Sequence, residues 1–221
     1  EEFDAVTQFH LLLASPRQGV LELIAPRAGD TAPENWVPAD AASYMTVNWD
    51  LGKTYTSFAA LYDKIRGEGA LVSSFEREVT NRLGIDFRKD VVEALAGRVT
   101  LVNAMVRPAR LNSRANLLGV QLKDAKAFEK TLETVIAKAG PQMSQDTFAG
   151  VTIYRAPARK PRAKQAPNQP LIRQPDPAVA IVDDYLLVTD ALDLLKQAIV
   201  AKSNASQSLA ERVAGAVHHT A

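Results

Sequence analysis

The chain has 221 residues, of which 47% are hydrophobic and 23% are charged, and its formal net charge is +1. This composition excludes wholesale disorder and fibrous repeats. The small net charge excludes attraction of nucleic acid or anionic lipid by the whole surface, so that any such binding must be local. The sequence has no cysteine, which excludes disulfides, thiol nucleophiles, iron–sulfur clusters and cysteine zinc sites.

The length favours one elaborated domain over residues 1–221. No apolar run reaches the roughly 18 residues of a transmembrane helix. The chain opens with Glu1-Glu2-Phe3-Asp4 and has no initiator methionine, so we expect a processed or trimmed product. We also expect its C-terminus to be cut short.

The first elements in chain order are predicted from local composition. Residues 5–14 and 20–25 are apolar and flank a Ser-Pro-Arg-Gln-Gly turn, which predicts a β-hairpin. Three prolines between residues 26 and 38 predict an irregular loop after it.

A strand, an Asp and an amphipathic helix then follow one another three times, in residues 44–65, 116–139 and 185–202. Asp50, Asp124 and Asp190 stand where a carboxylate can accept hydrogen bonds from the first helical turn, and all three are predicted to be helix caps. Each helix keeps a 3.6-residue apolar stripe, predicted to be buried against a sheet. The stripes are Leu51, Tyr55, Phe58, Tyr62 and Ile65; Phe128, Leu132, Val135, Ile136 and Ala139; and Leu192, Leu195 and Ile199.

Between the first two units, residues 71–83 and 88–96 are predicted to be helices, with Val72, Phe75, Val79 and Leu83 of the first one pointing inward. Gly84 and Gly97 would end them in the left-handed conformation. Strands are predicted at residues 98–106 and 150–156.

Residues 178–189 are predicted to form a tight hairpin around Asp183-Asp184. Ser208 and Glu211 resemble a capping box that opens a last helix. The pattern predicts an α+β fold with a mixed, mainly antiparallel sheet, repeated strand–helix units, and amphipathic helices packed on one face.

No catalytic or cofactor motif is complete. Gly52-Lys53-Thr54 lacks the earlier glycine of a phosphate-binding loop, because Val47 stands there, and the sequence predicts no nucleotide binding. Gly67-Glu68-Gly69 follows a helix and lacks the third glycine of a dinucleotide fingerprint.

The sequence also gives little support for a metal site or for a Ser-His-Asp catalytic triad. His218 and His219 are adjacent and cannot form the i, i+4 zinc arrangement, and His10 stands alone. Asp183, Asp184, Asp190 and Asp193 cluster in sequence but lack the spacing of a calcium loop. We therefore predict no cofactor, no metal and no catalytic residue.

Residues 155–177 differ from the rest of the chain. They contain six prolines, and 157–177 is predicted to be an extended, solvated insertion without regular structure. One acidic residue accompanies six basic ones, whereas the remaining chain has 20 basic and 24 acidic residues. The six could bind an acidic polymer or protein; they are Arg155, Arg159, Lys160, Arg162, Lys164 and Arg173. A plain insertion between two strands is the competing interpretation.

The two tryptophans are candidates for a ligand groove, since Trp is common at binding surfaces. Trp49 shares a strand face with Val47 and is predicted to pack in the core. The sequence does not decide the position of Trp36.

Three stretches of sequence resemble a known family. NRLGIDFRKDVVEALAGRVTLV (81–102), VPADAASYMTVNWD (37–50) and AIVDDYLLVTD (180–190) are similar to an uncharacterised bacterial family, domain of unknown function 3352. The resemblance covers about residues 36–202. It implies an extracytoplasmic or envelope-associated protein and brings no catalytic residues.

These observations leave three hypotheses. The favoured one is a non-enzymatic extracytoplasmic module that binds or scaffolds through the open face of the sheet or the basic segment. The alternative is a carrier that holds a lipid or another amphiphile in an apolar pocket. A hydrolase is the least favoured, because it would need His10 or the Asp183 group in a cleft beside a nucleophile.

Overall fold

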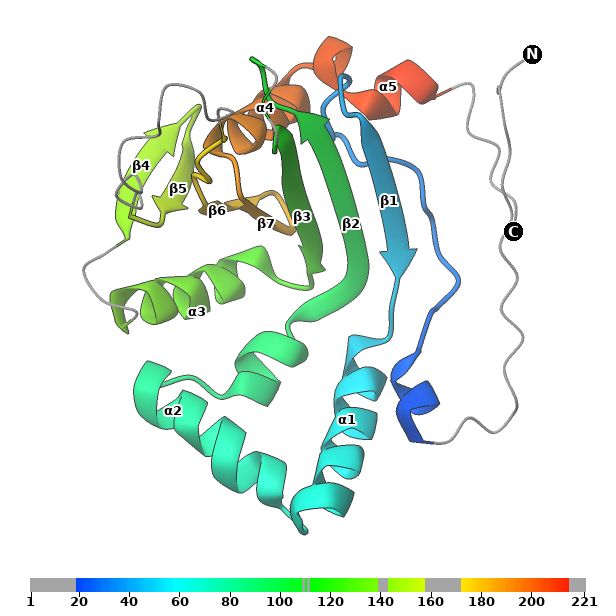
Figure 1. Cartoon of the computed structure of the whole chain (residues 1–221), viewed down its shortest axis with the longest axis vertical. Helices are drawn as coiled ribbons and strands as arrows, with labels where there is room; N and C mark the ends of the chain where they lie inside the picture. Colours follow the sequence, from blue (N-terminus) through cyan, green and yellow to red (C-terminus); the bar gives the residue numbers. More distant parts are fainter. Residues whose placement is uncertain (1–18, 109, 111, 139–142, 158–171, 215–221) are drawn as a thin grey trace.

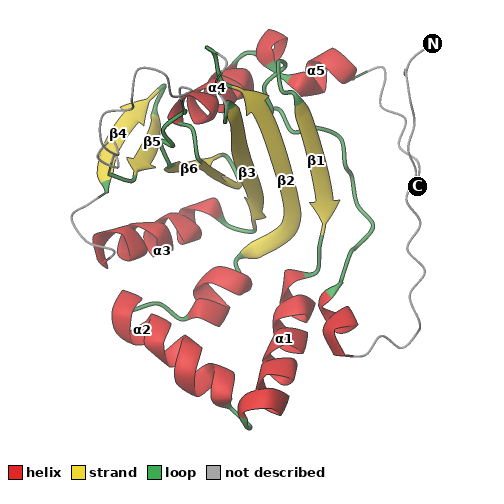
Figure 2. Ribbon diagram, in the orientation of Figure 1, coloured by secondary structure: helices red, strands yellow, loops and turns green. Residues whose placement is uncertain are grey.

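A computed structural model describes residues 19–108, 110, 112–138, 143–157 and 172–214. Seven strands form one antiparallel sheet in the order β1-β2-β3-β7-β6-β5-β4 (Figures 1 and 2), which confirms the predicted α+β class. The strands are β1 (Ser43–Asn48), β2 (Leu95–Met105), β3 (Arg114–Leu122), β4 (Ser144–Phe148), β5 (Val151–Arg155), β6 (Ala178–Val182) and β7 (Tyr185–Thr189).

The helical elements comprise both α-helices and shorter turns. They are η1 (Gly19–Leu23), α1 (Leu51–Arg66), η2 (Val72–Glu76), α2 (Arg77–Leu83), η3 (Phe87–Val92), α3 (Ala125–Lys138), α4 (Leu192–Ser203), η4 (Ala205–Gln207) and α5 (Leu209–Val213). The elements η2 and η3 are π-helical, while η1 and η4 are 3₁₀ turns. None of the described helices is long and apolar enough to cross a membrane.

The repeated strand–helix units are confirmed, because β1 leads to α1, β3 to α3 and β7 to α4. The predicted hairpin is also present: β6 and β7 pair around Asp183, whose φ is 52°. The helices lie at different places around the sheet (Figure 1): α1 and α2 beyond its lower end, α5 at its upper end, and α4 against β3, β6 and β7.

One face of the sheet forms the core with α4. The register aligns Thr100, Gly119, Leu187, Ala180 and Ile153 across five strands on this face. The row has a glycine at position 119, because the ring of Trp36 lies so close there that an added Cβ would be 2.4 Å from it. On α4, Leu192, Leu195 and Ile199 are buried against this layer, as their stripe predicted.

Two of the three predicted aspartate caps are confirmed. The Oδ1 atom of Asp50 accepts from the backbone N–H of Lys53 at 2.9 Å, and that of Asp124 accepts from Ala127 at 3.0 Å. Ser208 caps α5 by accepting from the N–H of Ala210 at 3.2 Å. The third predicted cap, Asp190, is wrong, for a reason that lies in the site described below.

Several local predictions are wrong. Residues 19–23 form a 3₁₀ turn rather than part of a strand, and the predicted first strand of that hairpin lies outside the described residues. Gly97 does not end a helix; it lies inside β2, at an irregularity in its pairing with β3. Its φ is 98°, and an added Cβ would be 2.3 Å from the carbonyl oxygen of Trp49. The sequence also missed β4, a short edge strand.

Candidate functional site: an aromatic groove and an open sheet face

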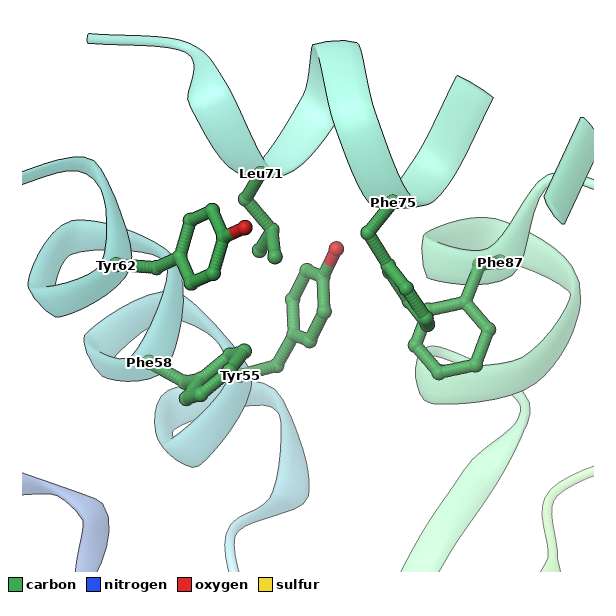
Figure 3. A pocket seen from close by; sticks show the side chains of 6 residues that line it. All are labelled: Tyr55, Phe58, Tyr62, Leu71, Phe75 and Phe87. Atoms are coloured by element: carbon green, nitrogen blue, oxygen red, sulfur yellow. The ribbon is translucent and has the colours of Figure 1, made fainter. Parts of the chain in front are cut away.

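A groove lies between α1, η2 and η3 (Figure 3). Asp50 starts α1 at the end of β1, so the helix leaves the sheet and contacts η1 and η3 instead. The groove encloses about 420 Å³. Its six lining side chains are Tyr55, Phe58 and Tyr62 from α1, Leu71 just before η2, Phe75 from η2, and Phe87 from η3.

The aromatic rings of the groove contact one another at tilted angles. The centroids of Tyr55 and Phe87 are 6.0 Å apart, those of Phe58 and Tyr62 are 6.1 Å apart, and those of Phe75 and Phe87 are 5.0 Å apart. Tilted and edge-to-face pairs of this kind are the favourable geometry for aromatic side chains. The walls are therefore held in place by one another as well as by their helices.

The sequence predicted that this stripe of α1 would be buried against the sheet, and that prediction is wrong. No residue of α1 is buried, and Phe58 and Ile65 are 42% and 73% exposed. On the facing element, Val72 and Phe75 were predicted to point inward but are 54% and 42% exposed. Leu71, by contrast, is 2% exposed. Apolar side chains thus remain open to solvent on both sides of the groove.

One polar contact crosses the groove. The hydroxyl of Tyr55 donates a hydrogen bond to the carboxylate of Glu76, at the end of η2. Burial, and then this carboxylate, raise the pKa of Tyr55 well above its usual range. A tyrosine hydroxyl is already protonated at neutral pH, and this environment disfavours the phenolate further, so Tyr55 serves as a hydrogen-bond donor.

The opposite face of the sheet is apolar and largely uncovered. The register aligns Met45, Leu101, Leu118, Val188, Val179 and Tyr154 in one row across six strands. Met45, Leu118 and Val188 are 57%, 37% and 41% exposed. At the β5–β6 end α3 approaches this face, where Leu132 and Glu129 lie beside Thr152, Tyr154 and Ile181.

The six predicted anion-binding residues divide into two groups. Arg159, Lys160, Arg162 and Lys164 lie outside the described residues, so their role stays a prediction. Arg155 lies on β5, where its guanidinium is 3.1 Å from Asp176 and 3.7 Å from Asp146. Arg173 is 9% exposed.

Arg173 forms the centre of an internal hydrogen-bond network. Its guanidinium donates to the carboxylate of Asp190 at 2.9 Å and to the backbone carbonyls of Asp190 and Arg114 at 2.8 and 3.0 Å. Asp190 also accepts from the backbone N–H and the side-chain amide of Asn116. The carboxylate is therefore occupied by these donors and does not cap α4, whose N-cap residue is Ala191.

The network determines the titration of Asp190. Burial alone would raise the pKa of this carboxyl group, but the hydrogen bonds from Asn116 and the charge and hydrogen bonds of Arg173 outweigh it, and the pKa is lowered. The described geometry thus gives Arg173 a structural role.

The remaining candidates have structural partners as well. Trp36 is 2% exposed and packs against Tyr185, with ring centroids 5.4 Å apart, so it does not line a groove. Trp49 is half-buried and donates from its indole nitrogen to the hydroxyl of Thr54 at 2.7 Å.

The aspartates that cluster in sequence near residue 183 bond to separate partners in the structure. Asp183 pairs with Lys202 at 2.6 Å, and Asp184 accepts from the amide of Gln121 at 2.7 Å. Within the described ranges, no group of three acidic or histidine side chains is placed to hold a metal ion. All three histidines lie outside those ranges.

The sequence identified every apolar residue of α1 in the groove but not their function. Periodicity detects an apolar face, yet it does not tell which element covers that face. The aromatic content of the stripe, three rings within residues 55–62, was the available signal.

Comparisons with known proteins give one match. Neither curated proteins nor solved structures include a match to the chain. The family model described as "Protein of unknown function (DUF3352)" matches residues 17–216. The chain therefore belongs to the DUF3352 family.

Proposed function

We propose that the chain is a non-enzymatic binding module that takes up an apolar or amphiphilic small molecule in the aromatic groove. One observation carries this proposal: the apolar stripe of α1 faces η2 and η3 across about 420 Å³ instead of packing on the sheet. Cavities of this size with mostly apolar walls are typical of small-molecule sites. Covering the exposed parts of Phe58 and Phe75 would contribute on the order of 1 kcal/mol for each ring.

The chemistry of the walls supports binding without turnover. The only polar atoms on the six lining side chains are the hydroxyls of Tyr55 and Tyr62. Tyr55 is held in its neutral form by burial and by Glu76. A hydrolase would need a nucleophile and a base in contact with the reacting atoms, and these six side chains supply neither.

The test is calorimetric titration with dodecyl maltoside below its critical micelle concentration. The wild-type chain should bind the detergent with a negative heat-capacity change, and Phe58→Asp should weaken binding by about tenfold or more, because a carboxylate in an apolar wall must stay hydrated. Ile65→Asp is the matched control, since Ile65 lies on the same helix, is more exposed and does not line the groove. Equal loss in both variants, or failure of the wild type to bind any dodecyl amphiphile, would refute the proposal.

A second candidate function is scaffolding through the open sheet face, supported by the exposed apolar row that includes Leu118 and Val188. We propose a second copy of the chain as its partner, because the exposed apolar row of one molecule could be buried against the same row of another in a two-fold dimer. Sedimentation at increasing concentration should then show self-association that Leu118→Lys with Val188→Lys abolishes. A monomer at all concentrations would exclude this function.

We also propose an envelope location in bacteria, which rests on the family resemblance. Fractionation of the source cells, followed with an antibody against the chain, should recover it with periplasmic or membrane material. Recovery with the cytoplasm alone would contradict this part of the proposal.

A further inference from the structure

We infer that the aromatic groove prefers amphiphiles with a cationic head group of the quaternary ammonium class. This inference rests on the proposed function and names the ligand class of the same site. It is carried by two independent features, the aromatic character of the walls and the sign of the charge beside them.

The walls are more aromatic than an acyl chain requires. Five of the six lining side chains are rings, contributed by three separate elements. The face of an aromatic ring carries negative electrostatic potential and attracts an organic cation within about 6 Å of its centre. Interplanar angles of 42°, 50° and 84° between neighbouring rings turn their faces in different directions around the space (Figure 3).

The charge beside the rings is acidic. Glu76 follows Phe75 directly, and its carboxylate is bonded to the hydroxyl of Tyr55, which points into the space between Leu71 and Phe75 (Figure 3). No cationic side chain of the described residues forms an ion pair with Glu76. A cationic head group near this hydroxyl would be attracted by the carboxylate, whereas an anionic one would be repelled.

The other charges that act on Tyr55 do not reverse this sign. Glu76 acts on Tyr55 more strongly than Arg88, whose positive charge opposes it, and Asp86 adds a second, weaker negative contribution. The guanidinium of Arg88 lies 3.3 Å from the carboxylate of Glu93, and both side chains are more than half exposed. Because Arg88 has its own counter-ion, the groove keeps a negative environment.

The size of the groove leaves room for part of the tail. A trimethylammonium group alone would not fill about 420 Å³. With the head group beside Tyr55 and Glu76, the tail would cover the exposed rings of Phe58 and Phe75. The ligand is thus an amphiphile rather than a small free ammonium ion.

The experiment compares three probes that share one tail: dodecyltrimethylammonium, dodecyl maltoside and dodecanoate, each below its critical micelle concentration. The expected order is cation, then neutral, then anion, with about tenfold between the cation and the anion at low salt and less at high salt. Glu76→Gln should reduce the affinity for the cation toward that for the maltoside.

The matched control is Glu78→Gln, which removes the same charge two residues later, from a carboxylate paired with Arg82 on the exposed surface of α2. Equal affinity for the three probes, or tightest binding of dodecanoate, would overturn the inference and leave the proposed function standing. Binding of none of them would overturn both. The order measured with the wild-type chain decides the question even if Glu76→Gln fails to fold.

Discussion

The hydroxyl of Tyr55 and the carboxylate of Glu76 join α1 to η2 across the aromatic groove. These residues are 21 positions apart, and their hydrogen bond is a polar link between two elements whose facing side chains are otherwise apolar. The bond fixes the separation of the two walls and places a negative charge beside the rings.

Tyr55→Phe should destabilise the fold by about 1–3 kcal/mol, since the bond has a charged acceptor and is partly buried. The measurement is urea unfolding followed by circular dichroism. Tyr62→Phe is the control, because no hydrogen bond of the Tyr62 hydroxyl is found within the described part of the chain, and its effect should be much smaller. Equal effects of the two substitutions would show that the Tyr55 bond contributes nothing specific.

Arg173→Met should cost about 3–5 kcal/mol, because it leaves the carboxylate of Asp190 and three backbone carbonyls without their buried cationic partner. Arg155→Met serves as the comparison. Its side chain is 33% exposed and pairs with carboxylates that are 65% and 40% exposed, so its loss should cost less than about 1 kcal/mol. The midpoints of thermal unfolding of the two variants give the difference directly.

The contribution of Asp190 to the free energy of unfolding is expected to fall as the solution becomes acidic. Its pKa is lowered in the folded state, so the carboxylate adds stability above its ordinary value of 3.8, and this stability is lost as the pH falls through the folded pKa. The difference in unfolding free energy between the wild type and Asp190→Asn should therefore be constant near neutral pH and shrink in acid. A difference that grows on acidification would contradict the assigned network.

Anion binding by the basic segment is tested with a variant that keeps Arg173. Replacing Arg159, Lys160, Arg162 and Lys164 with Gln should abolish any salt-sensitive binding to an acidic polymer such as heparin, because four positive charges are removed. Unfolding of this variant should match that of the wild type. A deletion that extended to Arg173 would instead remove a buried structural side chain, and lost binding could then reflect lost folding. Retention of salt-sensitive binding by the fourfold variant would exclude the segment as the binding element.

Sequence reasoning succeeded where the determinants are local. The caps at Asp50 and Asp124 depend on backbone groups three residues away, and the β6–β7 hairpin depends on two adjacent turn residues. Asp190 was assigned wrongly because its partners, Arg173 and Asn116, are 17 and 74 residues distant and outcompete the first turn of α4.

The groove, too, could be predicted from local sequence only in part. The periodicity of α1 correctly identified Tyr55, Phe58 and Tyr62 as one face. That the face meets η2 and η3 rather than the sheet depends on how α1 leaves β1, which no local pattern contains. The strand β4 was missed because four of its five residues are polar and exposed, without the alternation that predicts a half-buried strand.

That polar composition of β4 bears on how the protein stays dispersed. As the last strand in the order, β4 pairs with β5, and no other described strand pairs with its outer edge. Unpaired edges recruit strands from other molecules, especially when their side chains are apolar. Ser144, Gln145, Asp146 and Thr147 are all polar and exposed, and Asp146 adds a charge to the strand. The strand that sequence patterns detect least readily is thus the one suited to prevent end-to-end polymerisation of a sheet whose open face is already apolar.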